Sequence, residues 1–237
     1  MKVTTLFACH CLGLAWYAFL MHEISGITRR GRKDAPAAVL PYGGHWKFLT
    51  VLNLLLQAVY YGVALLVDAC VLMKKYRIAK SMFPLRDLLF GALAFPVSMF
   101  VFTCFWALYS YDRELVYPKD IDLIIPTWTN HAMHTTILPL VLLELLVTPR
   151  RNPSKAKGIS FLLIASVAYV CWLLWIHSVT GKWAYPFFDF LSPLSTTVFF
   201  LGCAVFLLFF FNMGGFLCRM IWGDSIVILD IYKKKSK

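Results

Sequence analysis

The chain has 237 residues, of which 60% are hydrophobic and only 15% are charged, and its mean hydropathy is +0.70. Because an ordinary soluble domain carries about 25% charged residues, this composition excludes one. The formal net charge of +11 arises from short basic clusters between apolar runs. That distribution indicates contact with anionic lipid rather than with nucleic acid.

Six apolar segments are each long enough to cross the hydrocarbon core of a bilayer, which takes about 20 residues. We therefore predict a polytopic membrane protein with an all-α fold. Its single domain, 1–237, is expected to hold six transmembrane helices in one bundle and to end in a basic tail, 223–237. The residues KKYRIAKSMFPLR, at 74–86, are expected to form a loop. The predicted helices cover residues 4–24, 47–73, 87–110, 127–148, 159–179 and 195–222.

Two prolines fall inside predicted helices. Pro96 lies in the third helix and Pro139 in the fourth. Each should kink its helix, because proline removes one backbone hydrogen bond. A kink one turn beyond His134 would also open space beneath that residue.

The Lys and Arg residues are unevenly divided between the two sides of the predicted bundle. The side that holds both termini carries the larger share, so both termini are predicted to be cytosolic, although RRGRK in the first loop argues the other way. The last four residues, Lys234-Lys235-Ser236-Lys237, resemble the dilysine retrieval signal of endoplasmic-reticulum membrane proteins. We therefore expect an integral, multi-pass protein of the endoplasmic reticulum. The plasma membrane, or a tail that only contacts anionic lipid, is the alternative.

Polar side chains form a stripe on the second predicted helix. Thr50 and Gln57 lie about 20° apart around the helix axis, and Asn53 lies about 60° from Thr50. Polar groups inside a membrane are costly unless they find partners or face a cavity. The stripe therefore marks this helix face as a candidate site.

The fourth predicted helix carries a second stripe, in the sequence NHAMHTT. Asn130 and His134 lie about 40° apart around the axis, and His131 and His134 about 60°. Both helices enter the membrane from loops on the same side, with Thr50 about one turn deep and His134 about two. The two stripes are therefore expected to meet in one leaflet.

A hydroxyl and an imidazole at one depth suggest a nucleophile and its base. The Thr50 hydroxyl becomes nucleophilic only when a neighbouring base takes its proton, and the imidazole of His134 suits that role. Supporting roles, orienting the imidazole or donating to an oxyanion, would fall to Asn130, Asn53, Gln57 or His131. Carboxylates of the third loop remain possible orienters: Asp112, Asp120 and Asp122.

The same residues also fit roles without catalysis. Polar side chains commonly join transmembrane helices by hydrogen bonds, and threonine often bonds to its own helix. A zinc site would need His131 and His134 together with His10 or His177. The HxxH spacing and the lack of an accompanying acidic ligand argue against it, so we predict neither a metal nor a cofactor.

Several motifs, in this order along the chain, resemble one family of membrane proteins. The family comprises the androgen-induced gene 1 proteins and the androgen-dependent tissue-factor-pathway-inhibitor-regulating proteins, and NLLLQ, LAFPVS and NHAMHT look closer to the latter. The resemblance covers essentially the whole chain and is weaker in the first and last helices. The motifs are YGGHWKFLT, LRDLLF, LAFPVS, YDRELVYPK, IPTWTNHAMHT, NPSKAKG and TGKWAYP.

The resemblance implies a six-helix membrane hydrolase that cleaves fatty acid esters of hydroxy fatty acids. The family's nucleophile is the threonine that ends W-K-[FY]-[LM]-T, which is Thr50 here, and its second catalytic residue is the later histidine of N-H-x-M-H, which is His134. Both motifs are intact. His45 stands at a variable position, and the first loop is longer and more basic, so the substrate preference is open.

We therefore expect an ester hydrolase whose lipid substrate reaches the site from the bilayer and passes through an acyl-threonine intermediate. The alternative from a different class is a lipid-binding or transport protein that acts through partners without catalysis. Few intramembrane charges and no duplicated broken helices argue against a transporter. Cleavage of a purified fatty acid ester by the purified protein separates the two.

Overall fold

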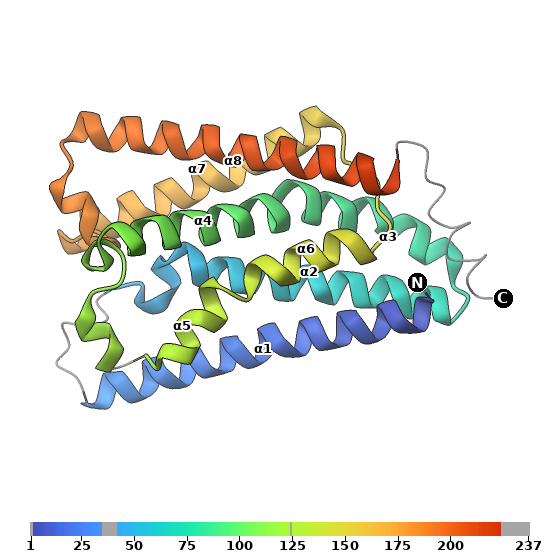
Figure 1. The fold of residues 1–237 in the computed structure, drawn as a ribbon, viewed down its shortest axis with the longest axis horizontal. Coiled ribbons are helices and arrows are strands. Elements are labelled where there is room, and N and C mark those ends of the chain that lie inside the picture. The colour runs from blue at the N-terminus through green and yellow to red at the C-terminus, as the bar shows by residue number, and fades with distance from the viewer. Residues whose placement is uncertain (1, 35–41, 124, 224–237) are drawn as a thin grey trace.

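The structure is a computed structural model that describes residues 2–34, 42–123 and 125–223 and shows a bundle of helices along one long axis (Figure 1). Within those ranges there is no β-strand. The all-α, six-helix prediction is confirmed, because six stretches are long and apolar enough to cross a membrane. They are Val3–Ile27, Leu49–Leu72, Tyr76–Tyr111, Thr127–Val147, Lys155–Thr180 and Pro193–Trp222.

The beginning of α1 (Val3–Asp34) and the end of α8 (Pro193–Trp222) lie at the same end of the bundle (Figure 1). The side of the membrane on which that end lies stays a prediction. The dilysine sequence falls in 224–237, outside the described residues. We call the end of the bundle that holds Val3 and Trp222 the terminal end, and the opposite one the loop end.

The first two spans, α1 and α2 (Leu49–Leu72), run antiparallel and pack along their length. The α1 helix continues beyond its predicted end at residue 24 to Asp34, and a 3-10 turn, η1 (Gly44–Lys47), leads into α2. Buried apolar side chains of α1 and α2 form the centre of the core. Thr50 thus stands in the first turn of a firmly packed helix, at the loop end.

The third span corrects the prediction of a loop at 74–86. The helix α3 (Tyr76–Leu89) begins directly after a short turn and continues through a π-helical turn, η2 (Phe90–Ala94), into α4 (Phe95–Tyr111). The residues that α3 buries share one helix face: Ala79, Phe83, Arg86 and Asp87. This amphipathic spacing explains why a segment rich in basic residues is helical.

Each of the two prolines lies beside an irregularity in its span. The π turn η2 directly precedes Pro96 in the first turn of α4. The fourth span is interrupted at Thr135 and Thr136, which separate α5 (Thr127–His134) from α6 (Ile137–Val147). Because Pro139 has no N–H, it cannot bond to the Thr135 carbonyl four residues earlier, and this carbonyl instead accepts from the Leu138 N–H, within the irregular stretch between α5 and α6.

The last two spans, α7 (Lys155–Thr180) and α8, leave many apolar side chains exposed, among them Ile164, Val198 and Phe209. Such a surface suits contact with lipid. A 3-10 turn, η5 (Pro186–Phe190), lies in their connection, and two others, η3 (Arg113–Leu115) and η4 (Lys119–Leu123), lie between α4 and α5.

A buried ionic cluster joins three spans towards the terminal end. His10 of α1 contacts Asp68 of α2 at 2.7 Å, and Arg150 donates to Glu144 of α6 at 2.7 Å. The Tyr60 hydroxyl also donates to Glu144. Since Asp68 lies 18 residues beyond Thr50 on α2, it is about 27 Å away along the helix axis. This cluster is therefore part of the scaffold and not of the site described next.

Candidate active site

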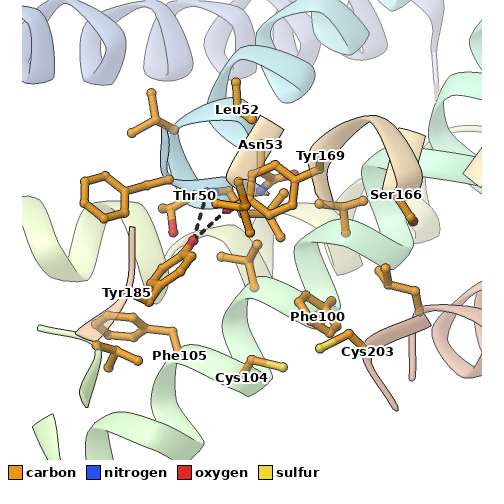
Figure 2. A pocket seen from close by; sticks show the side chains of 18 of the residues that line it. Thr50, Leu52, Asn53, Phe100, Cys104, Phe105, Ser166, Tyr169, Tyr185 and Cys203 are labelled. Atoms are coloured by element: carbon orange, nitrogen blue, oxygen red, sulfur yellow. Dashed lines mark hydrogen bonds between the residues drawn. The ribbon is translucent and has the colours of Figure 1, made fainter. Parts of the chain in front are cut away.

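The two polar stripes meet at the loop end of the bundle. The Oγ1 atom of Thr50 lies 3.0 Å from Nε2 of His134, although the residues are 84 positions apart in the chain. Thr50 stands in the first turn of α2, and His134 is the last residue of α5. Thr50 is half-buried and lines a cavity (Figure 2). His134 is only 5% exposed.

Asn130 holds the His134 ring from the opposite side. The Nδ1 atom of His134 lies 2.8 Å from Oδ1 of Asn130 and 3.1 Å from the Asn130 backbone carbonyl oxygen. A carbonyl oxygen only accepts, so Nδ1 carries the proton and donates. In the neutral ring, Nε2 then presents its lone pair to the Thr50 hydroxyl, as a general base requires.

Phe105 of α4 supplies a third support for the imidazole. Its ring stacks on the His134 ring, with centroids 3.5 Å apart and an interplanar angle of 7°. The stack restricts rotation of the imidazole and keeps water from one of its faces. The sequence offered no sign of this contact, because Phe105 is one aromatic residue among many in an apolar span.

Asn53 follows Thr50 by about one turn on the same helix and also lines the cavity (Figure 2). It is 1% exposed, and its Oδ1 atom accepts from Nε2 of Gln57 at 3.3 Å. Its Nδ2 atom finds no hydrogen-bond partner among the described residues. A buried amide N–H group without a partner is costly. Because Asn53 lines the same cavity as Thr50, this group is suited to donate to an oxygen of a ligand there.

Gln57 is engaged within the helix bundle. Its Nε2 atom donates to the Ala94 carbonyl at 3.0 Å and to Oγ of Ser98 at 2.8 Å. These bonds tie α2 to the π turn and to α4. Gln57 thus supports Asn53 instead of reaching the cavity.

Two tyrosines brace the N-terminus of α2, and sequence reasoning missed both. The Leu49 backbone N–H donates to the Tyr185 hydroxyl at 3.0 Å, and Tyr185 and Tyr169 contact each other through their hydroxyls at 3.1 Å (Figure 2). The first N–H groups of a helix have no partner within it, and the phenol supplies one next to Thr50. Burial raises the pKa of Tyr185, so the phenol stays neutral.

The other candidate residues lie away from the pair. His131 is exposed and bonds through Nδ1 to Thr135 at 3.1 Å. Asp112 accepts from the Glu114 backbone N–H, and Asp122 pairs with Arg113 at 2.8 Å. The side chain of Asp120 lies outside the described part of the structure. Of the orienters considered, the one that bonds to the imidazole is therefore the amide of Asn130.

The histidines of the zinc alternative do not converge. His10 belongs to the ionic cluster, and the His177 ring stacks on Trp183 with centroids 4.0 Å apart. Among the described residues, no group of three or more His, Cys, Asp or Glu side chains could hold a metal ion. The arrangement around Thr50 is instead that of a hydroxyl with a base.

The cavity has a volume of about 1070 Å³, which is at the upper end of the range for small-molecule sites. Its walls come mainly from α2, α4, α7 and α8, with further residues from α1, from α5 and the segment before it, and from the turn η5. The described lining residues include no Lys, Arg, Asp or Glu. A ligand with a charged head group would therefore find no ionic partner here, whereas a neutral ester between apolar chains would fit.

Comparison with known proteins gives one consistent result. A family model described as FAR-17a/AIG1-like protein matches residues 5–219. The human androgen-dependent TFPI-regulating protein is 43% identical over 224 residues, covering 94% of this chain and 96% of that protein. The human androgen-induced gene 1 protein is 39% identical over 203 residues, covering 83% and 85%. A membrane protein of Schizosaccharomyces pombe is 26% identical over 160 residues, covering 67% and 68%. No solved structure matches the chain.

Proposed function

The chain belongs to the FAR-17a/AIG1-like family, and from that premise we propose that it is an integral membrane hydrolase of fatty acid esters of hydroxy fatty acids. The observation that carries the proposal is the 3.0 Å contact between Thr50 Oγ1 and His134 Nε2 at the wall of an apolar cavity. The apolar lining supports a neutral lipid ester as the substrate. The further choice of a hydroxy-fatty-acid ester rests on the family resemblance of the two motifs.

In the first half-reaction, His134 Nε2 takes the proton of Thr50 while Oγ1 attacks the ester carbonyl carbon. The Nδ2 group of Asn53, which lines the cavity and has no hydrogen-bond partner among the described residues, is the proposed donor to the developing oxyanion. The tetrahedral intermediate then collapses, and the bond to the alkoxide of the hydroxy fatty acid breaks. His134 returns its proton to that alkoxide, which leaves an acyl-threonine.

In the second half-reaction, a water molecule takes the place of the leaving alcohol. His134 accepts one proton of this water as the oxygen attacks the acyl carbon. Collapse of the intermediate breaks the bond to Thr50 Oγ1, which recovers the proton from Nε2. The fatty acid leaves, and no cofactor is consumed.

The test compares purified wild-type protein with Thr50→Ala and His134→Ala in cleavage of a fatty acid ester of a hydroxy fatty acid. We expect a loss of about a thousandfold or more in each variant, as for removal of a nucleophile or its base in other hydrolases. A fluorophosphonate probe should label Thr50. Matched controls are Thr135→Ala and His131→Ala, which change the same residue types outside the cavity and should retain activity.

Turnover retained in Thr50→Ala would remove the nucleophile assignment. Binding of the ester by wild-type protein with no release of acid would instead favour the lipid-binding alternative.

A further inference from the structure

The helices α7 and α8 approach closely at the terminal end of the bundle and separate towards the loop end (Figure 1). At the close end, a Cβ atom added to Gly158 of α7 would lie 2.5 Å from the ring of Phe211 on α8. Leu162 and Leu207, one helical turn from that contact, are 1% and 8% exposed and line the cavity. Beyond them, the cavity occupies the space between the diverging helices.

Of the seven described residues that both line the cavity and are exposed, six lie on these two helices, and the other is Ala107 of α4. On α7 they form a row at intervals of four residues, Leu163, Val167 and Cys171, and on α8 they include Leu201 and Gly202. Val167 is 60% exposed and Leu201 is 63% exposed. A side chain that borders the cavity and is also exposed marks an opening, and we call these five residues the slit.

Gly202 keeps the α8 edge of the slit clear. A Cβ atom added at this position would meet no heavy atom within 4 Å, in contrast to Gly158 at the closed end. Nothing in the packing therefore requires glycine at position 202. A larger side chain at this position would extend into open space at the edge of the cavity without displacing a neighbour.

The slit lies within the depth of the hydrocarbon core. Leu201 is eight residues from the start of α8, and Val167 is thirteen residues from the end of α7, or about 12 Å and 20 Å at 1.5 Å per residue. The hydrocarbon core is about 30 Å thick. None of the five slit residues is charged, so the opening faces acyl chains and not lipid head groups.

From this geometry we propose that the slit between α7 and α8 is the portal through which an acyl chain of a lipid ester passes laterally from the bilayer to Thr50. The proposal rests on the hydrolase function proposed above. Its occupant is an acyl chain, because the slit is continuous with the apolar cavity at whose wall Thr50 lies. Gly202 and the α7 row then select substrates by the width of chain that they admit.

The kinetic test uses full-length Gly202→Leu in liposomes and compares a long-chain fatty acid ester of a hydroxy fatty acid with a soluble acetate ester. We expect the ratio of long-chain to acetate activity to fall by about tenfold, because a leucine side chain would occupy the open space at the edge of the slit and narrow the passage for an acyl chain. The matched control is Gly62→Leu, a helical glycine that also has open space around its Cβ position but lies outside the cavity. An unchanged ratio, or an equal fall with both esters, would overturn the portal.

A second measurement does not depend on turnover. A diazirine-bearing long-chain ester is photo-crosslinked to Thr50→Ala protein in liposomes, and the labelled peptides are mapped. Labelling of the slit residues that is reduced in the Thr50→Ala/Gly202→Leu double variant would support the portal. This conclusion holds even if wild-type protein releases no acid, because the missing acid release would defeat only the proposed function. Label confined to other helices, with turnover intact in wild-type protein, would defeat only the portal.

Discussion

Replacing Asn130 by alanine tests how the imidazole is held. The Nδ1 atom of His134 has two acceptors, the Asn130 side chain at 2.8 Å and the Asn130 backbone carbonyl at 3.1 Å. Asn130→Ala removes only the first, so the carbonyl still selects the tautomer with a free Nε2. The stack on Phe105 also remains. The variant therefore holds the His134 imidazole less firmly in its orientation but keeps the tautomer that acts as a base.

The size of the effect follows from those contacts. A neutral hydrogen bond contributes about 0.5–1.5 kcal/mol net, which corresponds to a decrease of about two- to twelvefold in kcat/KM. The decrease should appear in kcat, because orientation of the base matters at the chemical step. His134→Ala, which removes the base, should cost about a thousandfold or more.

The assay is initial-rate hydrolysis over a range of ester concentrations in detergent micelles. Asn212→Ala is the matched control, because this exposed amide donates to the Leu208 carbonyl of its own helix, and its loss should leave the rate unchanged. A decrease in Asn130→Ala as large as that of His134→Ala would show that the backbone carbonyl cannot hold the tautomer. An unchanged rate would show that the side-chain bond contributes nothing to catalysis.

Two further predictions concern the scaffold. Tyr185→Phe removes the acceptor of the Leu49 N–H, a loss comparable to that of a helix cap. We therefore expect about 1 kcal/mol of destabilisation, a thermal midpoint lower by about 2–4 °C and reduced hydrolysis. A midpoint and a rate equal to those of wild type would contradict the bracing role. Glu144→Gln leaves the buried Arg150 guanidinium without its ionic partner, and we expect a loss of about 3–5 kcal/mol in folding stability. The measurement is thermal unfolding in detergent, and the control is Glu114→Gln, which changes an exposed carboxylate. Equal midpoints for the two glutamine variants would show that the cluster does not stabilise the bundle.

Local sequence patterns determined the number of spans and the positions of the two stripes. The bilayer thickness sets a minimum length for an apolar helix, so the lengths of the apolar segments predicted six spans. The helical repeat placed Thr50 and His134 on polar faces that enter the membrane from the same side. That information is contained within single helices and needs no knowledge of how they pack.

The tertiary structure decided which side chains complete the site. Phe105 and Tyr185 carry no local signal, because a ring stack and a helix-capping phenol exist only once distant segments pack together; Leu49 and Tyr185 are 136 residues apart. The same holds for the choice of Asn130 over the loop carboxylates, since a helix turn brings its amide to Nδ1 while Asp112 and Asp122 bond elsewhere. Periodicity specifies the face of a helix on which a residue lies, but only packing specifies what that face meets.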